Sequence, residues 1–234
     1  MDNRIKQIRE SEKKSHIKMY SSDEIYQSGS WLNRPIKTIK DIIPIFQGYQ
    51  KLRVLDLGCG VGRNSIFIAE EYKEIDCIVE CVDILELAIE KLSFNAEKYG
   101  VSEYIRGVVK PIEEYTIKEN KYDFIIAVSA LEHVETVESF LSKLEEIRDG
   151  ICENGVVCLV MNSEVREKDK VTGEELPAQF EVNLKTKELQ EILNWTFEGW
   201  TVLKTSVQEQ QYDIPRESGI CDLQTKVVSF VARK

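Results

Sequence analysis

Short apolar segments alternate with longer segments of helical period along the chain as far as Asn162. Apolar runs of strand length stand at 52–57, 77–84, 104–109, 122–130 and 155–162. Between them, apolar residues recur every three or four positions, which predicts helices at 63–72, 85–100 and 138–151. Strands that alternate with helices in this way are typical of a parallel sheet covered by helices. The pattern therefore predicts an α/β fold.

The regular alternation stops after Asn162. Residues 163–183 are polar and charged, and a connection of this length predicts a loop over a site rather than a linker. A helical pattern returns at 185–194. The segments 200–208 and 226–234 resemble two strands that pair as a hairpin at the edge of the sheet.

The segment at 28–46, before the first strand, predicts a helix that begins at Asn33 and Pro35. We expect this helix to lie across the carboxyl ends of the strands, where open parallel sheets bind their ligands. A more N-terminal helix contains His16 and is strongly charged, so we expect His16 to be solvated.

Length and charge exclude several classes of protein. The 234 residues suit one α/β domain with a full core. No apolar run approaches the roughly 20 residues of a membrane span, and the charged N-terminus resembles neither a secretory signal nor an anchor. The net charge of −10 disfavours a nucleic-acid partner, because a phosphate backbone requires a basic face.

The six cysteines show no CxxC pair and no zinc-site spacing, and no other metal-ligand cluster is present. Four of them lie in or beside apolar segments, where free thiols are commonly buried: Cys77, Cys81, Cys152 and Cys158. We therefore expect no metal, and a cytoplasmic protein whose thiols stay reduced.

The sequence VLDLGCGVGRNS, at 54–65, places three glycines at alternate positions directly after the first strand. Gly58, Gly60 and Gly62 let the backbone approach a ligand closely. The dinucleotide-binding fingerprint is GxGxxG, whereas in this turn the third glycine comes one residue early. No GK[ST] follows, which excludes a phosphate-binding P-loop.

Two acids indicate which nucleotide the turn accepts. Asp56 ends the first strand, where it would repel a pyrophosphate but suit a cation such as an α-ammonium group. Asp83 ends the second strand, where a carboxylate accepts both hydroxyls of a ribose. S-adenosylmethionine (SAM) joins an amino acid to a nucleoside without any phosphate. The two acids therefore predict SAM as the cofactor.

The same residues resemble the motifs of class I SAM-dependent methyltransferases. VLDLGCGVGRNS is similar to their first motif, CVDI to their second-strand acid, YDFIIAVSALEHV to their fourth strand and the following loop, and ICENGVVCLV to their fifth strand. A narrower resemblance is carried by WLNRPIKTI, FEVNLKTKELQEIL and the terminal FVARK. These segments resemble the tellurite-resistance methyltransferases, which are similar to thiopurine-type small-molecule methyltransferases.

The resemblance implies a single Rossmann-like, doubly wound domain with a mostly parallel seven-stranded sheet, one antiparallel edge strand and helices on both faces. Residues 1–50 would form a helical cap, 51–162 the cofactor-binding core, and 163–234 a lid loop, a helix and final strands that shape the acceptor pocket. The implied reaction moves the SAM methyl group to a small-molecule acceptor by in-line displacement and releases S-adenosylhomocysteine. The methylated atom can be oxygen, nitrogen, sulfur or an oxyanion. We expect no nucleic-acid or membrane partner, and a monomer or homodimer.

We expect the cofactor to be held by the glycine turn and by the ends of the neighbouring strands. The predicted cofactor-binding residues are Asp56 at the methionine end, Asp83 on the ribose, Ile84 and Ile112 at the adenine, and Gly58, Cys59, Gly60, Arg63 and Ser129 around the turn.

Three further side chains are candidates for the acceptor side. His133 follows the fourth strand, where it would face the acceptor as a general base, or would bond to Glu132 or the backbone instead. Trp31 and Tyr26 would form an apolar lid, or would pack the first covering helix on the sheet.

Two departures from the family patterns keep other functions open. Many class I enzymes have an acid after the third strand, where this chain has Lys110 and Pro111. Tellurite-type enzymes have a late His-Arg pair that is absent here, and Arg216 would replace it only in part. A SAM-binding module or sensor without turnover is therefore one alternative. A nicotinamide-dependent oxidoreductase is a weaker one, because Asp56 and the early third glycine disfavour it.

Overall fold

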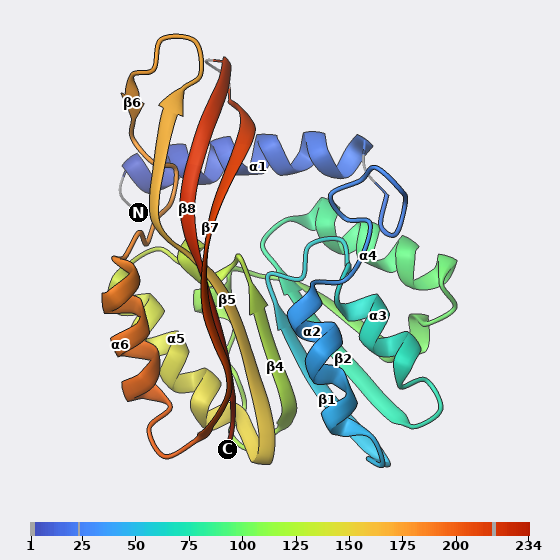
Figure 1. Cartoon of the computed structure of the whole chain (residues 1–234). Helices are drawn as coiled ribbons and strands as arrows, with labels where there is room; N and C mark the ends of the chain where they lie inside the picture. The colour runs from blue at the N-terminus through green and yellow to red at the C-terminus, as the bar shows by residue number, and fades with distance from the viewer. Residues whose placement is uncertain (1–2, 23, 217–218) are drawn as a thin grey trace.

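A sheet of eight strands runs through the computed structural model, which describes residues 3–22, 24–216 and 219–234 (Figure 1). The main path has the order β3-β2-β1-β4-β5-β8-β7, and β6 pairs with β5 outside this path. The strands are β1 (Lys51–Leu57), β2 (Asp76–Asp83), β3 (Ile105–Val109), β4 (Tyr122–Val128), β5 (Ile151–Asp169), β6 (Glu175–Leu176), β7 (Thr201–Arg216) and β8 (Gly219–Arg233).

The strand directions confirm the predicted mostly parallel sheet. Strands β1 to β5 are parallel wherever they pair along the main path, whereas β8 runs antiparallel to both β5 and β7. The antiparallel strand therefore lies one place in from the edge, and β7 forms the edge itself. The expected hairpin is also confirmed, because Gln208 of β7 pairs with Val227 of β8.

Helices cover both faces of this sheet, as expected. They are α1 (Asn3–Ser22), α2 (Lys37–Ile42), α3 (Ser65–Glu71), α4 (Glu86–Lys98), α5 (Val137–Gly150) and α6 (Thr186–Thr196). Buried residues of α2, α3 and α4 belong to one hydrophobic cluster, and those of α5 and α6 belong to a second. Helix α5 also has a side-chain cap, because Thr136 accepts a hydrogen bond from the Ser139 amide.

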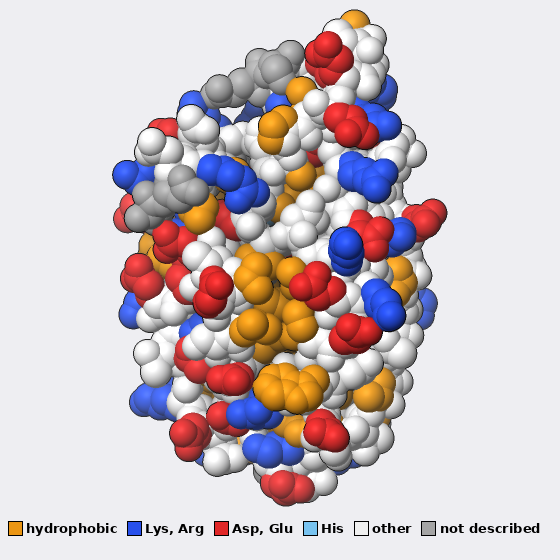
Figure 2. Space-filling view, turned by 90° about the vertical axis from the view of Figure 1, so that its left-hand side faces the viewer, with side chains coloured by type: hydrophobic (Ala, Val, Ile, Leu, Met, Phe, Trp, Pro, Cys, Tyr) orange, Lys and Arg blue, Asp and Glu red, His pale blue; other side chains and the backbone are white. Residues whose placement is uncertain are grey.

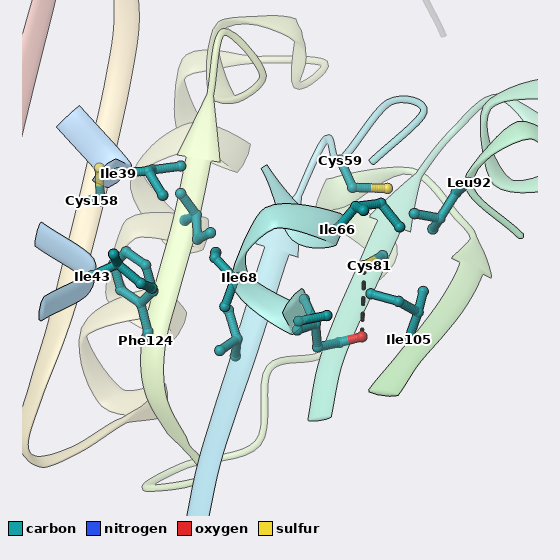
Figure 3. Packing of buried hydrophobic residues seen from close by; sticks show 14 of the residues in the cluster. Ile39, Ile43, Cys59, Ile66, Ile68, Cys81, Leu92, Ile105, Phe124 and Cys158 are labelled. Carbon is teal, nitrogen blue, oxygen red and sulfur yellow. Dashed lines mark hydrogen bonds between the residues drawn. The ribbon is translucent and has the colours of Figure 1, made fainter. Parts of the chain in front are cut away.

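The two clusters lie on opposite faces of the central strands. In β1, Val54 belongs to the first cluster and Leu55 to the second, because successive side chains of a strand point to opposite faces. Figure 3 shows part of the first cluster, in which Ile66 of α3 and Leu92 of α4 lie close together. This packing fixes the carboxyl ends of β1 and β2 relative to the turn that connects β1 to α3.

The prediction of a loop over 163–183 was wrong in its first part. Strand β5 continues to Asp169, and its last residues pair with β8 from Arg166↔Gln224 to Asp169↔Cys221. The segment is too polar to show the apolar pattern of a strand. The backbone amides of this segment form hydrogen bonds in its pairing with β8. On one side of the segment, Val165 packs in a small third hydrophobic cluster that includes Leu223.

The helix expected over 28–46 is much shorter than predicted, and it lies elsewhere. Only α2 and a 3-10 turn at Ile43–Phe46 form, and both pack on a face of the sheet, where Ile39 and Phe46 are fully buried. The helix that crosses the carboxyl ends of the strands is α1 (Figure 1). Two apolar residues of α1, Ile5 and Ile8, are buried in spite of its charged sequence.

The outer surface carries apolar side chains as well as charges. Figure 2 shows one side of the molecule, where apolar side chains gather in the middle of the face among acidic and basic ones. The edge strand β7 contributes Val202, Leu203 and Val207 to the exposed apolar residues of the chain. In the part of the chain that the structure describes, no helix is both long enough and apolar enough to cross a membrane.

Candidate active site

A cavity of about 680 Å³ lies between α1 and the carboxyl ends of the strands. Its volume falls within the range of small-molecule sites, about 300–1,000 Å³. Nine of the ten predicted site residues line it: Gly58, Cys59, Gly60, Arg63, Asp83, Ile84, Ile112, Ser129 and His133. The fold thus brings together residues from the turn after β1 and from the ends of β2, β3 and β4. Their contacts with a cofactor stay predictions.

The glycine turn and Asp83 form one side of the cavity. Gly58 and Gly60 have φ angles of 71° and 54°, a left-handed conformation that favours glycine. The Gly60 amide donates a hydrogen bond to Oδ2 of Asp83, and the Leu85 amide donates one to Oδ1, each at 2.9 Å. Burial raises the pKa of Asp83, and the backbone donors oppose this rise by stabilising the charged form. Each carboxylate oxygen keeps a lone pair for a further donor.

Asp56 is the predicted site residue that does not line the cavity. Its side chain is buried below the turn, where it accepts a hydrogen bond from the Ser65 hydroxyl at the start of α3. Burial raises the pKa of Asp56 to about 6. In this structure Asp56 therefore ties β1 to α3, and it supports the turn from below.

Arg63 and Trp31 lie together at the rim of the cavity. The guanidinium carbon of Arg63 is 5.3 Å from the centre of the Trp31 ring, and Nη1 donates to the Trp31 carbonyl at 3.4 Å. Burial lowers the pKa of Arg63. Tyr26, the other half of the expected lid, is not among the cavity residues; its hydroxyl donates to the Arg63 carbonyl and its ring contacts Tyr99.

The remaining predicted residues present backbone or apolar surface. Ile84 is 47% exposed and Ile112 is 9% exposed, and both line the end of the cavity near β2 and β3. Ser129 has a left-handed φ of 49°, and its amide donates to Val160 of β5. Burial raises the pKa of the Cys59 thiol, which therefore stays protonated.

His133 meets acidic groups at the other end of the cavity. Its Nδ1 atom is 3.0 Å from Oε2 of Glu181, which lies in the loop before α6. The predicted alternative to a base role was a hydrogen bond from His133 to Glu132 or the backbone, and Glu181 was not predicted. Burial favours the neutral imidazole, but the Glu181 hydrogen bond and the charges of Glu132 and Glu12 outweigh it, so the pKa of His133 is raised.

A helical cap over 1–50 was expected, but the cavity residues of α1 were not predicted. Seven residues of this helix line the cavity, and five of them recur at helical spacing: Lys6, Arg9, Lys13, His16 and Tyr20. The expectation that His16 is merely solvated was therefore wrong. The helical spacing of these residues can be seen in the sequence. However, a mostly charged helix face resembles a solvated one as long as the surface that it packs against is unknown.

Glu113 was missed for a different reason. Many class I enzymes have an acid directly after the third strand, where this chain has Lys110 and Pro111. Glu113 lies slightly later, in the 3-10 turn Ile112–Glu114, and this turn places Glu113 in the cavity wall. There Glu113 pairs with Arg9 of α1. The segment after β3 thus supplies an acid three residues further along the chain.

The suggestion that Arg216 replaces part of a catalytic His-Arg pair was wrong. Arg216 does not line the cavity, and its side chain is 3% exposed. It pairs with Glu12 of α1 at 2.6 Å and with Glu167 of β5 at 2.8 Å. The Arg216 guanidinium therefore joins α1 to the end of β5 through these two ion pairs. Among residues 3–22, 24–216 and 219–234, no group of three or more His, Cys, Asp or Glu side chains is placed to hold a metal ion.

The chain is similar in sequence to known methyltransferases. Residues 54–155 match a family model described as a methyltransferase domain. Over 107 residues the chain is 34% identical to a ubiquinone biosynthesis O-methyltransferase of Rickettsia canadensis (strain McKiel), and the alignment covers 45% of this chain and 42% of the relative. The chain thus spans less than half the length of that relative.

Solved structures share the fold over more of the chain. TehB from Haemophilus influenzae superposes with a TM-score of 0.61 at 23% identity, over 83% of this chain and 62% of that chain. The 1,6-didemethyltoxoflavin-N1-methyltransferase of Burkholderia thailandensis, solved with 1,6-didemethyltoxoflavin and S-adenosylhomocysteine, gives a TM-score of 0.60 at 18% identity, over 97% and 89%. At these identities the likeness concerns the fold alone.

Proposed function

We propose, since residues 54–155 match a methyltransferase domain, that the chain is a class I enzyme that transfers the methyl group of SAM to a small-molecule acceptor. The proposal rests on one observation: the glycine turn, Asp83 and His133 line the same cavity. No feature of this cavity favours the oxidoreductase or the sensor without turnover.

The residues present fit SAM as the bound group. A Cβ atom at Gly60 would lie 2.8 Å from the Tyr20 hydroxyl, so the bare backbone of the turn allows α1 to come close to this wall of the cavity. Asp83 would hold the ribose hydroxyls, Ile84 and Ile112 the adenine, and Arg63 the methionine carboxylate. When bound, SAM supplies a methyl group that is activated by its sulfonium. The chain's residues then align the acceptor and exclude water.

His133 would be the catalytic residue on the acceptor side. It lines the cavity with part of its imidazole exposed, so it is placed to accept a proton from the attacking group. The acceptor would be a small molecule, because α1 closes the cavity on the side away from the sheet.

Replacing Asp83 by alanine should weaken SAM binding by about 1–3 kcal/mol, because a charged hydrogen-bond acceptor is lost. Isothermal titration calorimetry with SAM measures this, and S-adenosylhomocysteine and NADH serve as parallel ligands. The matched control is Asp76→Asn, at the opposite end of β2, where the side chain is exposed and pairs with Arg53. Equal SAM affinity in the wild type and Asp83→Ala would remove the ribose assignment. Binding of NADH but not SAM would overturn the proposed function.

We also propose a cytoplasmic protein that acts as a monomer or homodimer without a nucleic-acid partner. All six cysteines are free thiols, which fits a reducing compartment. The net charge of −10 fits a small-molecule acceptor better than a nucleic acid.

A further inference from the structure

His133 and Glu181 come from segments that lie far apart in the sequence and meet in the cavity wall. His133 ends the 3-10 turn Leu131–His133 after β4, and Glu181 lies between β6 and α6. We propose that Glu181 is a positioning residue: it accepts the Nδ1 hydrogen of His133 and thereby leaves Nε2 as the proton acceptor. This inference rests on the proposed function, and it assigns the acceptor to compounds that carry a proton on the methylated atom.

The donor in this hydrogen bond is fixed by the chemistry of its two groups. An ionised carboxylate can only accept hydrogen bonds, so Nδ1 must carry the hydrogen that lies between His133 and Glu181. Neutral imidazole has one N–H, and its other nitrogen is therefore unprotonated. Nε2 hydrogen-bonds to none of the residues that the structure describes, and it is left as the basic atom.

The surroundings hold Glu181 in this role. Its side chain is 1% exposed, whereas that of His133 is 27% exposed. The Val182 amide donates to the Glu132 carbonyl, which fixes the backbone next to Glu181. The Phe180 ring lies 4.8 Å from the imidazole centre and limits its rotation. The ring of His133 is thus held by a hydrogen bond on one edge and by packing on one face.

Charged groups from several elements act on this pair. Arg9 of α1 lies on the other oxygen of Glu181, with its Nε atom 3.5 Å from Oε1, and it also pairs with Glu113. The acids that act on His133 itself are Glu181, Glu132 in the adjoining turn and Glu12 of α1. Arg9 is in turn paired with Glu113 and lies near Glu135. An imidazolium that forms during the reaction is therefore stabilised, chiefly by Glu181.

The step balances as follows. The acceptor's X–H bond breaks, and its proton moves to Nε2 of His133. The electron pair on X forms the bond to the methyl carbon, while the pair of the old carbon–sulfur bond stays on the sulfur of the donor. Glu181 remains ionised throughout, and the proton later leaves Nε2 for solvent. A hydroxyl, thiol or N–H acceptor needs this step, whereas a tertiary amine or an oxyanion does not.

Nitrogen-15 NMR of the histidine side chains tests the assignment without any acceptor. The chain has two histidines, so a His16→Asn background leaves His133 as a single reporter. We expect the neutral form of His133 to carry its hydrogen on Nδ1. In Glu181→Gln, the proton affinity of His133 should fall by about tenfold or more, because an opposite charge in contact is lost. Glu113→Gln is the matched control, since it removes a carboxylate from the same wall without touching His133.

Two results would overturn the inference. One is a neutral His133 that carries its hydrogen on Nε2. The other is a titration that shifts no more in Glu181→Gln than in Glu113→Gln. Both readouts are independent of SAM, so they are distinct from a failure of SAM binding in calorimetry, which would instead remove the proposed function. Glu181→Asp, which keeps the charge, should retain more of the raised proton affinity than Glu181→Gln does.

Discussion

Replacing Arg216 by alanine is expected to destabilise the protein by about 3–5 kcal/mol, because it leaves buried carboxylates without their counterion. Arg216 donates to both oxygens of Glu167, at 3.0 and 2.8 Å, and to Glu12 at 2.6 Å. The Glu167 side chain is 1% exposed and has little access to water in place of the lost cation. Urea unfolding, followed by circular dichroism, measures the loss.

The matched control for this prediction is Arg148→Ala. Arg148 also pairs with a carboxylate, Asp149, but both side chains are well exposed, so its loss should cost only about 0–1 kcal/mol. A double variant, Arg216→Met with Glu167→Met, removes both charges of the more deeply buried pair and should recover much of the stability. Equal unfolding free energies for Arg216→Ala and Arg148→Ala would show that the pairing does not stabilise the fold. Because Glu12 lies on α1, weaker SAM binding should accompany the loss of Arg216.

Gly58→Ala is expected to destabilise the protein by about 2–5 kcal/mol and to weaken SAM binding. One part of the cost is the left-handed backbone, about 1–2 kcal/mol for a residue with a Cβ atom. The other part is a clash, since the new Cβ would lie 2.3 Å from the Cβ of Ala130, and overpacking of this kind costs about 1–3 kcal/mol. Ala130 lies after β4, so relief of the clash would move apart two walls of the cavity.

Gly48 separates these two contributions. Its φ angle is 88°, also left-handed, but nothing lies within 4 Å of a Cβ atom built there. Gly48→Ala should therefore show the backbone cost alone, with SAM affinity unchanged. Adding Ala130→Gly to Gly58→Ala should bring the unfolding free energy back toward that of Gly48→Ala. If Gly58→Ala costs no more than Gly48→Ala, the close packing between the turn and the loop after β4 is not a constraint on the site.

Sequence patterns were sufficient for the elements that bury apolar faces within the central sheet. β1, β2 and β4 were predicted to within a few residues, because their side chains contact core on both faces and each strand is mostly apolar. The turn after β1 was equally clear, because only glycines suit its left-handed angles. Nine of the predicted site residues lie in this turn, at the end of β2 or in the segments that follow β2, β3 and β4, and the fold places them together.

Charged segments were the ones that sequence patterns misjudged. The end of β5 is polar and was expected to be a loop, yet it is held by its pairing with β8 and by the Glu167–Arg216 contact. Helix α1 lies within the predicted helical cap, but its residue His16 was expected to be solvated, whereas His16 and other charged residues of α1 line the cavity. These contacts of β5 and α1 with Arg216 and β8 join residues 49 or more positions apart in the chain.

The sequence by itself determined the α/β class, the mostly parallel sheet and the turn and acid that indicate SAM, because each depends on local periodicity or on residues adjacent to a strand end. Only the tertiary structure decided that α1, rather than the segment at 28–46, covers the site, and that Glu181 is the partner of His133. The physical reason is that charged side chains show no periodic preference until their counterions are known. Those counterions are chosen by the packing of distant segments.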